Sequence, residues 1–238
     1  MKIGTDEITK LYLGSDEVSK VYLGSDEVYG GGSPTPSLPY TELAYIENGV
    51  YDGSKSNEYS IPLGIYPTLD TVVQIKGMLR NADGASYFGY NDYPGGNNNY
   101  FRLFTYAQNA MIFDFPSDGN RRLTMNNLPF GQTFELELGN CYIRDLTGTN
   151  NTVTGATVTD GNPRPVNFKG QLNCWSYSDN PASIYTGERF YYVKIWQNNT
   201  LMRDLVPAEY NGDIGLWDKV NNTFYGNVRS GVITYGTL

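Results

Sequence analysis

Short runs of alternating apolar and polar residues, each closed by Gly, Asn or Pro, most constrain what this chain can fold into. No stretch of ten residues has a helical periodicity of apolar positions. About a dozen strand-like segments instead follow one another at a spacing of 8–12 residues. This pattern is typical of a β-sandwich or jelly roll. The sequence therefore predicts an all-β domain over residues 40–238.

Alternation also predicts which residues of the most apolar strand, 189–197, face the core. Because side chains alternate between the two faces of a strand, we expect Tyr191, Val193 and Ile195 to point inward. The next expected strand ends at Pro207, since proline has no N–H to donate to a sheet.

Charge and composition exclude several classes of partner. The net charge is −8 and no basic run occurs, which argues against a nucleic-acid partner. No apolar run is long enough to span a membrane as a helix, so we expect no membrane insertion. The chain has no His, which removes the commonest general base and transition-metal ligand together. We expect neither a metal nor another cofactor.

The expected cellular compartment follows from the N-terminus. Asp6, Glu7 and Lys10 stand where a signal peptide has its apolar core. This predicts synthesis in a cytoplasm, where Cys141 and Cys174 are two reduced, buried thiols.

The first 29 residues repeat with a period of ten, in copies that begin at Gly4, Gly14 and Gly24. In each copy Gly-Ser/Thr-Asp-Glu is expected to form a turn and the following six residues a strand. Three such strands cannot bury a core of their own. We therefore interpret residues 1–29 as an attachment and oligomerisation segment, followed by a Gly/Pro linker over 30–39. The alternative is a β-meander packed on the main domain of the same chain.

The expected contact residues of this segment are its apolar and Tyr positions. They are Ile8, Leu11, Tyr12, Leu13, Val18, Val21, Tyr22, Leu23 and Val28.

Three motifs of the main domain resemble a known family. Leu43-Ala-Tyr-Ile-Glu47 resembles the opening of concanavalin A-like (laminin-G-like) jelly rolls from gut tailed phages and their hosts. The runs 192–207 and 215–225 resemble the Asn-rich hairpin and the Gly-anchored aromatic closure of the same domains. The resemblance implies a concanavalin A-like jelly-roll sandwich. In the closure, we expect Trp217 to be buried against the strand 191–195.

The decapeptide repeat is separately similar to repeats at the N-termini of phage tail and head-fibre proteins. Together the two resemblances imply a structural protein of a tailed-phage virion: a head fibre, a tail fibre or a capsid decoration. Its implied partners are other capsid or tail proteins and further copies of itself, most simply in a homotrimer. The alternatives are a free-standing bacterial carbohydrate-binding module and, less favoured, a glycoside hydrolase.

One pair of carboxylates has the spacing that glycoside hydrolysis needs. Glu135 and Glu137 share a strand face, with side chains roughly 7 Å apart. The related laminarinase-type enzymes carry Glu-x-Asp-x-(x)-Glu on one strand, whereas Gly139 and Asn140 follow here. The better interpretation is the solvent face of an amphipathic strand, and we expect no enzymatic activity.

Two loops have the composition of a saccharide-binding surface. The segments 87–100 and 176–185 are rich in Tyr, Asn and Asp. Tyr rings stack on sugar rings, and the amide and carboxylate groups of Asn and Asp hydrogen-bond to sugar hydroxyls. The alternative is that these are ordinary loops whose tyrosines support them on the sheet. The candidate glycan-binding residues are Tyr90, Asp92, Tyr93, Asn97, Asn98, Tyr100, Tyr177, Asp179 and Tyr185.

Overall fold

The computed structural model divides the chain into two compact units, Met1–Pro39 and Tyr40–Leu238. All helical or strand structure among the described residues is β-strand, and these residues form no helix. The structure describes residues 2–3, 6–7, 12–13, 16–17, 21–23, 26–29, 38–48, 61–65, 67–78, 86–92, 99–106, 110–115, 121–126, 131–147, 152–155, 171–172, 175–177, 180–182, 189–228 and 231–238.

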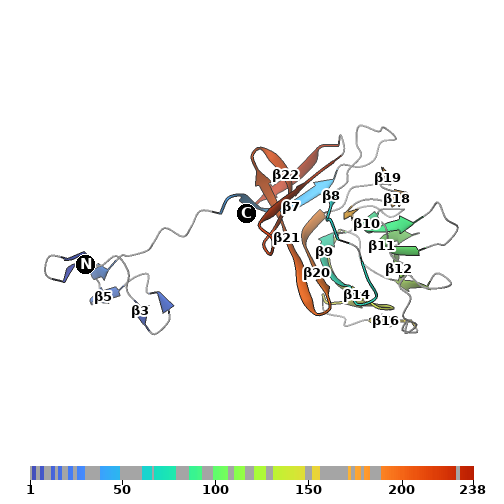
Figure 1. Ribbon diagram of the computed structural model, residues 1–238, viewed down its shortest axis with the longest axis horizontal. Helices are drawn as coiled ribbons and strands as arrows, with labels where there is room; N and C mark the ends of the chain where they lie inside the picture. The colour runs from blue at the N-terminus through green and yellow to red at the C-terminus, as the bar shows by residue number, and fades with distance from the viewer. Residues whose placement is uncertain are drawn as a thin grey trace. The chain divides into compact units, whose positions relative to one another are not determined.

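The first unit contains three two-stranded antiparallel hairpins, one for each repeat (Figure 1). They pair β1 (Lys2–Ile3) with β2 (Asp6–Glu7), β3 (Tyr12–Leu13) with β4 (Asp16–Glu17), and β5 (Val21–Leu23) with β6 (Asp26–Tyr29). The register is equivalent in all three, because Ile3, Leu13 and Leu23 each pair with the Asp three residues later.

The expected four-residue turn, Gly-Ser/Thr-Asp-Glu in each repeat, is wrong. The Asp and Glu of each repeat lie in a strand, so only Gly-Thr or Gly-Ser connects the two strands. Two residues with Gly in first place suffice for a tight hairpin, which leaves Asp and Glu to pair. Among the predicted contact residues, Ile8, Leu11 and Val18 lie outside the described residues, while Tyr12, Leu13, Val21, Tyr22, Leu23 and Val28 lie on strands.

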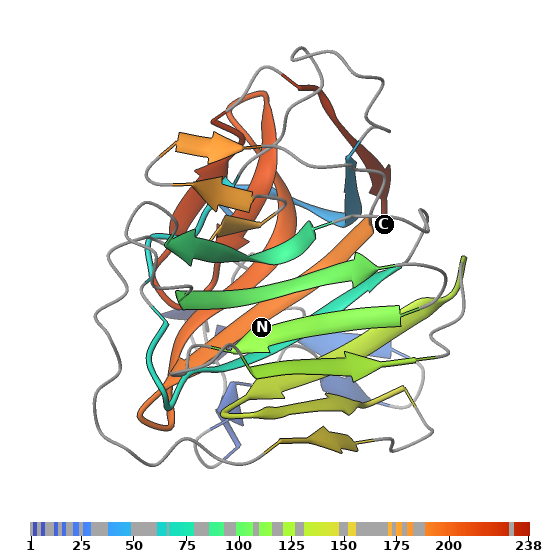
Figure 2. The same ribbon diagram turned by 90° about the vertical axis from the view of Figure 1, so that its right-hand side faces the viewer.

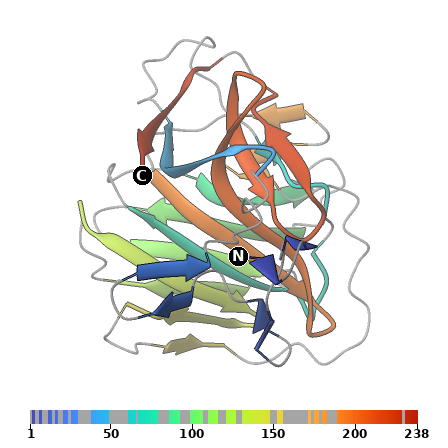
Figure 3. The same cartoon turned by 90° about the vertical axis from the view of Figure 1, so that its left-hand side faces the viewer.

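The larger sheet of the second unit has the order β16-β15-β14-β9-β20-β7-β21-β22-β23, with β24 paired to β7 (Figure 3). Among the described residues, its strands all pair antiparallel. The bounds are β7 (Thr41–Asn48), β9 (Val72–Met78), β14 (Thr133–Gly139), β15 (Tyr142–Asp145), β16 (Thr152–Thr154), β20 (Arg189–Gln197), β21 (Thr200–Tyr210), β22 (Asp213–Asp218), β23 (Thr223–Gly226) and β24 (Ile233–Thr237).

The smaller sheet has the order β13-β12-β11-β10-β17-β8, and β18 joins it by pairing with β10 and β19 (Figure 2). Its strands are β8 (Ile61–Pro62), β10 (Ser86–Asp92), β11 (Asn99–Tyr106), β12 (Ala110–Phe115), β13 (Arg121–Met125), β17 (Gln171–Leu172), β18 (Trp175–Tyr177) and β19 (Asn180–Ala182). The chain passes repeatedly from one sheet to the other, so sequence neighbours often lie in different sheets.

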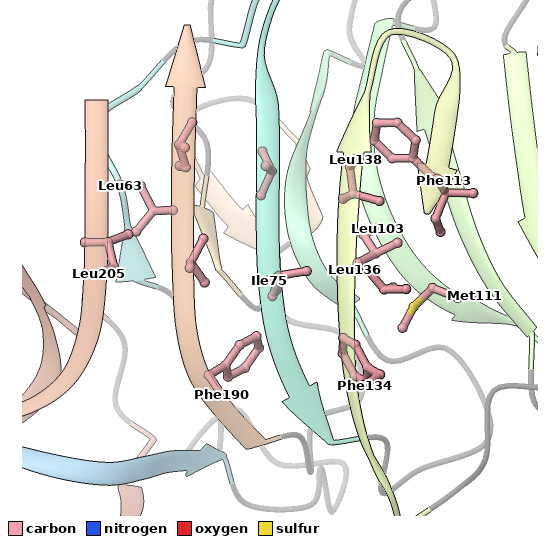
Figure 4. Close-up of a cluster of buried hydrophobic side chains, with 14 of the residues drawn as sticks. Leu63, Ile75, Leu103, Met111, Phe113, Phe134, Leu136, Leu138, Phe190 and Leu205 are labelled. Carbon is pink, nitrogen blue, oxygen red and sulfur yellow. The ribbon is translucent and has the colours of Figure 1, made fainter. Parts of the chain in front are cut away.

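The core lies between the two sheets (Figure 4). The larger sheet contributes fully buried residues such as Ile75, Leu136 and Phe190, and the smaller sheet contributes Leu103 and Phe113. Two sheets that bury one apolar face each, with chain crossings between them, form a sandwich. The predicted all-β jelly-roll sandwich is confirmed.

Two expectations about individual strands are wrong. Val193 and Ile195 are fully buried as predicted, but Tyr191 is not, because a bulge between Phe190 and Tyr192 shifts the alternation. Phe190 takes the inward position instead.

The strand β21 does not end at Pro207 but runs on to Tyr210. On one side its neighbour changes at this point, from β20, which it pairs up to Leu205, to β7, which it pairs from Ala208. A residue without an N–H is tolerated where the neighbouring strand changes, since no ladder bond is interrupted there.

Candidate functional site

The two Tyr- and Asn-rich segments meet in the smaller sheet. Strands β10 and β11 form a hairpin in which Asn91 pairs with Tyr100. On the other side of β10, strand β18 runs parallel and pairs Tyr177 with the same Asn91. Residues that pair across strands share one face of a sheet. The fold therefore brings Tyr100, Asn91 and Tyr177 into one row, although the two segments lie far apart in the sequence.

The register also separates the candidates. Tyr90 pairs with Phe101, one register position away from the pair of Asn91 and Tyr100. Asn91, Tyr100 and Tyr177 share the alternate register position. The sequence did not single out Asn91, whose only signal was its place between two candidates. Asp92 lies at the end of β10, and Tyr93, Asn97, Asn98, Asp179 and Tyr185 lie outside the described residues.

The two candidate carboxylates of β14 form hydrogen bonds and an ion pair with side chains of neighbouring strands. Tyr192 donates from its hydroxyl to Glu135 at 2.5 Å. Glu137 accepts from Gln74 Nε2 at 2.9 Å and from the Tyr142 hydroxyl at 3.1 Å, and it forms an ion pair with Arg144 at 3.2 Å. These contacts join four neighbouring strands on the outer face of the larger sheet.

The pKa values of Tyr142 and Tyr192, which donate to these carboxylates, are raised. Burial, reinforced by the charge of Glu137, raises the pKa of Tyr142 to about 12. Burial is also the main cause that raises the pKa of Tyr192, with the hydrogen bond to Glu135 second. Both hydroxyls therefore stay protonated and keep donating at any ordinary pH. The geometry is that of a cross-strand hydrogen-bond network.

The residues described hold no group of three His, Cys, Asp or Glu side chains that could bind a metal ion. They likewise include no helix with the length and apolar character to cross a membrane. Cys141 is a free and buried thiol, whereas Cys174 lies outside the described residues.

Trp217 is buried as predicted, but it does not pack against the strand 191–195 as expected. It stacks on Tyr40 with ring centroids 4.7 Å apart and also contacts Tyr210 at 5.3 Å. These rings belong to a second, smaller cluster, apart from the main core that Val193 and Ile195 occupy. Tyr40 is the first residue of the second unit, so this cluster holds the start of the domain against β22.

The neighbouring Asp218 was missed by sequence reasoning. Its carboxylate is fully buried and accepts from the backbone N–H groups of Asp204 and Val220, each at 3.0 Å. Asn221 Nδ2 donates to it at 2.7 Å, and the Arg203 guanidinium lies 3.5 Å away. The hairpin of β22 and β23 is thereby fixed to β21.

No protein-family model matches the sequence, and no curated protein matches it either. Several solved structures show a partial likeness. A heptameric SAP-like pentraxin from Limulus polyphemus is 8% identical over 82% of this chain and 95% of its own, with a TM-score of 0.46. Sheep galectin-11, in complex with glycerol, is 13% identical over 58% of this chain and 97% of its own, with a TM-score of 0.32.

A third structure is the enzymatically active domain of tailspike protein 2 from bacteriophage CBA120. It is 10% identical and covers 67% of this chain, which spans only 28% of that structure, and the TM-score is 0.41. At identities and TM-scores this low, none of these likenesses carries an argument about function.

Proposed function

We propose that this protein is a non-enzymatic structural component of a tailed-phage virion, a head fibre, tail fibre or capsid decoration made in the cytoplasm of the host bacterium. Residues 1–29 attach it to the particle and to further copies of itself. The sandwich is displayed and adheres to glycans of the host surface or mucosa. The sequence resemblances of the repeats and of the sandwich motifs suggest the virion setting.

The observation that carries the attachment role is the equivalence of the three hairpins. Each repeat pairs only within itself among the described residues, through strands of two to four residues. An isolated two-stranded hairpin is marginal in water unless it packs on something else. Three copies with one register therefore suit a surface that offers the same contact three times. A closed homotrimer, to which each chain contributes its residues 1–29, is a symmetric assembly that repeats such a contact.

The sandwich has its own core and does not depend on that contact. Among the described residues, 23 buried side chains form one continuous cluster between its sheets. A rigid sandwich that carries Tyr, Asn and Asp at one end of a sheet is suited to displaying a saccharide-binding surface. The row of Tyr100, Asn91 and Tyr177 is the part of that surface which the backbone pairing supports.

The attachment role is tested with the full chain and a variant that lacks residues 1–29. Light scattering at micromolar concentration should give three times the mass of one chain for the full protein, and the mass of one chain for the variant. Mass spectrometry of purified virions should detect the protein. Particles assembled without it should bind the added full chain but not the variant.

Two results would contradict the proposal. A monomeric full chain would remove the trimer, and equal binding of both forms to particles would show that the repeats are not the attachment segment. A protein absent from virions that still binds glycans would instead favour the free-standing carbohydrate-binding module.

A further inference from the structure

A cavity of about 350 Å³ lies at the edge of the larger sheet, whereas the Tyr- and Asn-rich strands belong to the smaller sheet. The start of β22, the end of β23 and the start of β24 form its walls. The lining residues are Gly212, Asp213, Ile214, Gly226, Asn227, Gly231, Val232 and Ile233. Its volume falls at the lower end of the range of small-molecule sites, about 300–1,000 Å³.

The polar groups of the cavity centre on Asp213. This side chain is exposed, and no hydrogen bond or ion pair of its carboxylate occurs among the described residues. Asn227 also lines the cavity and donates from Nδ2 to the carbonyl of Gly231 at 2.7 Å, which holds the segment before β24 in place. A carboxylate that lies in a concave site without a protein partner is available to accept hydrogen bonds from a ligand.

Glycines and aliphatic side chains complete the walls. Gly212 has a φ of +87° in the tight turn that precedes Asp213, so this position favours Gly for its conformation. Three glycines in the lining leave the backbone open to close approach by a ligand. Val232 is 75% exposed and Ile214 is partly buried, so one side of the cavity is apolar.

These groups discriminate among ligand classes. An anion is disfavoured, because Asp213 is the single ionisable group among the described lining residues and the chain carries a net charge of −8. A nucleobase is disfavoured because the part of the lining that the structure describes contains no aromatic ring. A neutral polyhydroxylated ring offers both hydroxyl donors for the carboxylate and C–H faces for the aliphatic wall.

We propose that this cavity is a second saccharide site, which binds one or two neutral sugar units through hydroxyl donors to Asp213 and apolar contact with Val232. It deepens the proposed glycan role of the domain. The two sites would let one domain engage a branched or extended glycan at two points.

The test uses the isotopically labelled full chain and the methyl glycosides of glucose, galactose, mannose and N-acetylglucosamine as probes. Binding of at least one glycoside should shift the backbone amide signals of Gly212, Gly226 and Gly231. Asp213→Ala should weaken that binding about 10- to 100-fold, as expected for the loss of a charged acceptor. The matched control is Glu209→Gln, which removes one charge from the position on β21 that pairs with Ile214, outside the described lining, and should leave binding unchanged.

Three outcomes would overturn the inference. If no glycoside shifts these amides, the cavity is not a saccharide site; glycan binding that Tyr100→Ala or Tyr177→Ala abolishes would then leave the first site standing. If binding persists in Asp213→Ala, the carboxylate does not recognise the sugar. If ethanolamine shifts the amides while the glycosides do not, the cavity binds cations. None of these results affects the attachment role, which light scattering tests separately.

Discussion

The hairpin of β3 and β4 and the hairpin of β20 and β21 have turns of the same length, but their strands differ in length and in the contacts that stabilise them. Each joins two antiparallel strands through two residues, Gly-Ser in the first and Asn198-Asn199 in the second. The strands have two residues each in the repeat, but nine and eleven in the sandwich. A tight turn therefore suffices to start a hairpin, and it does not decide how far the pairing extends.

Burial accounts for the difference. Phe190, Val193 and Ile195 of β20 are fully buried, and each apolar side chain removed from water stabilises the fold by about 1.5–3 kcal/mol. A residue distant in the sequence also stabilises the turn of the sandwich hairpin, since the backbone N–H of Asn198 donates to the Asp70 carboxylate. The repeat hairpins depend on contacts beyond the hairpin itself, as proposed above. This contrast predicts very different responses to mutation in the two units.

The largest effect on the sandwich is expected from Asp218→Ala. The change leaves the guanidinium of Arg203 without its buried counter-charge and two backbone N–H groups without an acceptor. Removing one partner of a buried pair costs about 3–5 kcal/mol. Urea unfolding measures the change, with Asp213→Ala on the same strand as the exposed control, expected within about 0.5 kcal/mol of the parent. Equal stabilities of the two variants would show that the carboxylate network is dispensable.

Trp217→Ala should cost about 3 kcal/mol, at the lower end of the range for large aromatic residues. The loss is not greater because Tyr210 and Phe224, in the same cluster, are only partly buried and can move into part of the space. Tyr40→Ala should destabilise in the same assay, and the double variant should cost less than the sum, because the two rings stack on each other. Strict additivity would contradict the stacked pair.

A smaller and pH-dependent effect is expected from Asp70→Asn. The hydrogen bond from Thr68, with that from the N–H of Asn198, lowers the pKa of the Asp70 carboxyl below its usual value of about 3.9. A lowered folded-state pKa stabilises the protein above the ordinary pKa, and this contribution is lost as the pH falls through the folded-state value. The stability difference between parent and variant should therefore be present at pH 7 and shrink at acidic pH. A difference that grows on acidification would contradict the assignment.

The smallest effect on the sandwich is expected from Leu11→Asp combined with Val21→Asp in the repeats. Both changes lie in the first unit, so the β-type circular dichroism and the main melting transition should match those of the parent. The same variant should be monomeric by light scattering and should fail to join particles, because burying unpaired charge at a contact costs several kcal/mol per site. A lowered melting temperature would favour the β-meander packed on the chain's own domain.

Local signals in the sequence predicted the parts of this fold that depend on neighbouring residues. Asn198 and Asn199 both have positive φ, at 49° and 57°, as the two-residue hairpin turn requires, and the alternation placed Val193 and Ile195 correctly. Turn type and alternation depend on a few adjacent residues, so the sequence carries them directly. For the candidate site, the composition of the two Tyr- and Asn-rich segments was likewise a local signal.

Tertiary structure alone decided what depends on distant partners. The bulge that turns Tyr191 away from the core, the change of neighbour at Pro207 and the stacking of Trp217 on Tyr40 all follow from which strands lie side by side. The same holds for the row that joins Asn91 to Tyr177, and for the cavity beside Asp213. Strand pairing between distant segments is selected by how two whole sheets bury their apolar faces together, and no short stretch of sequence contains that information.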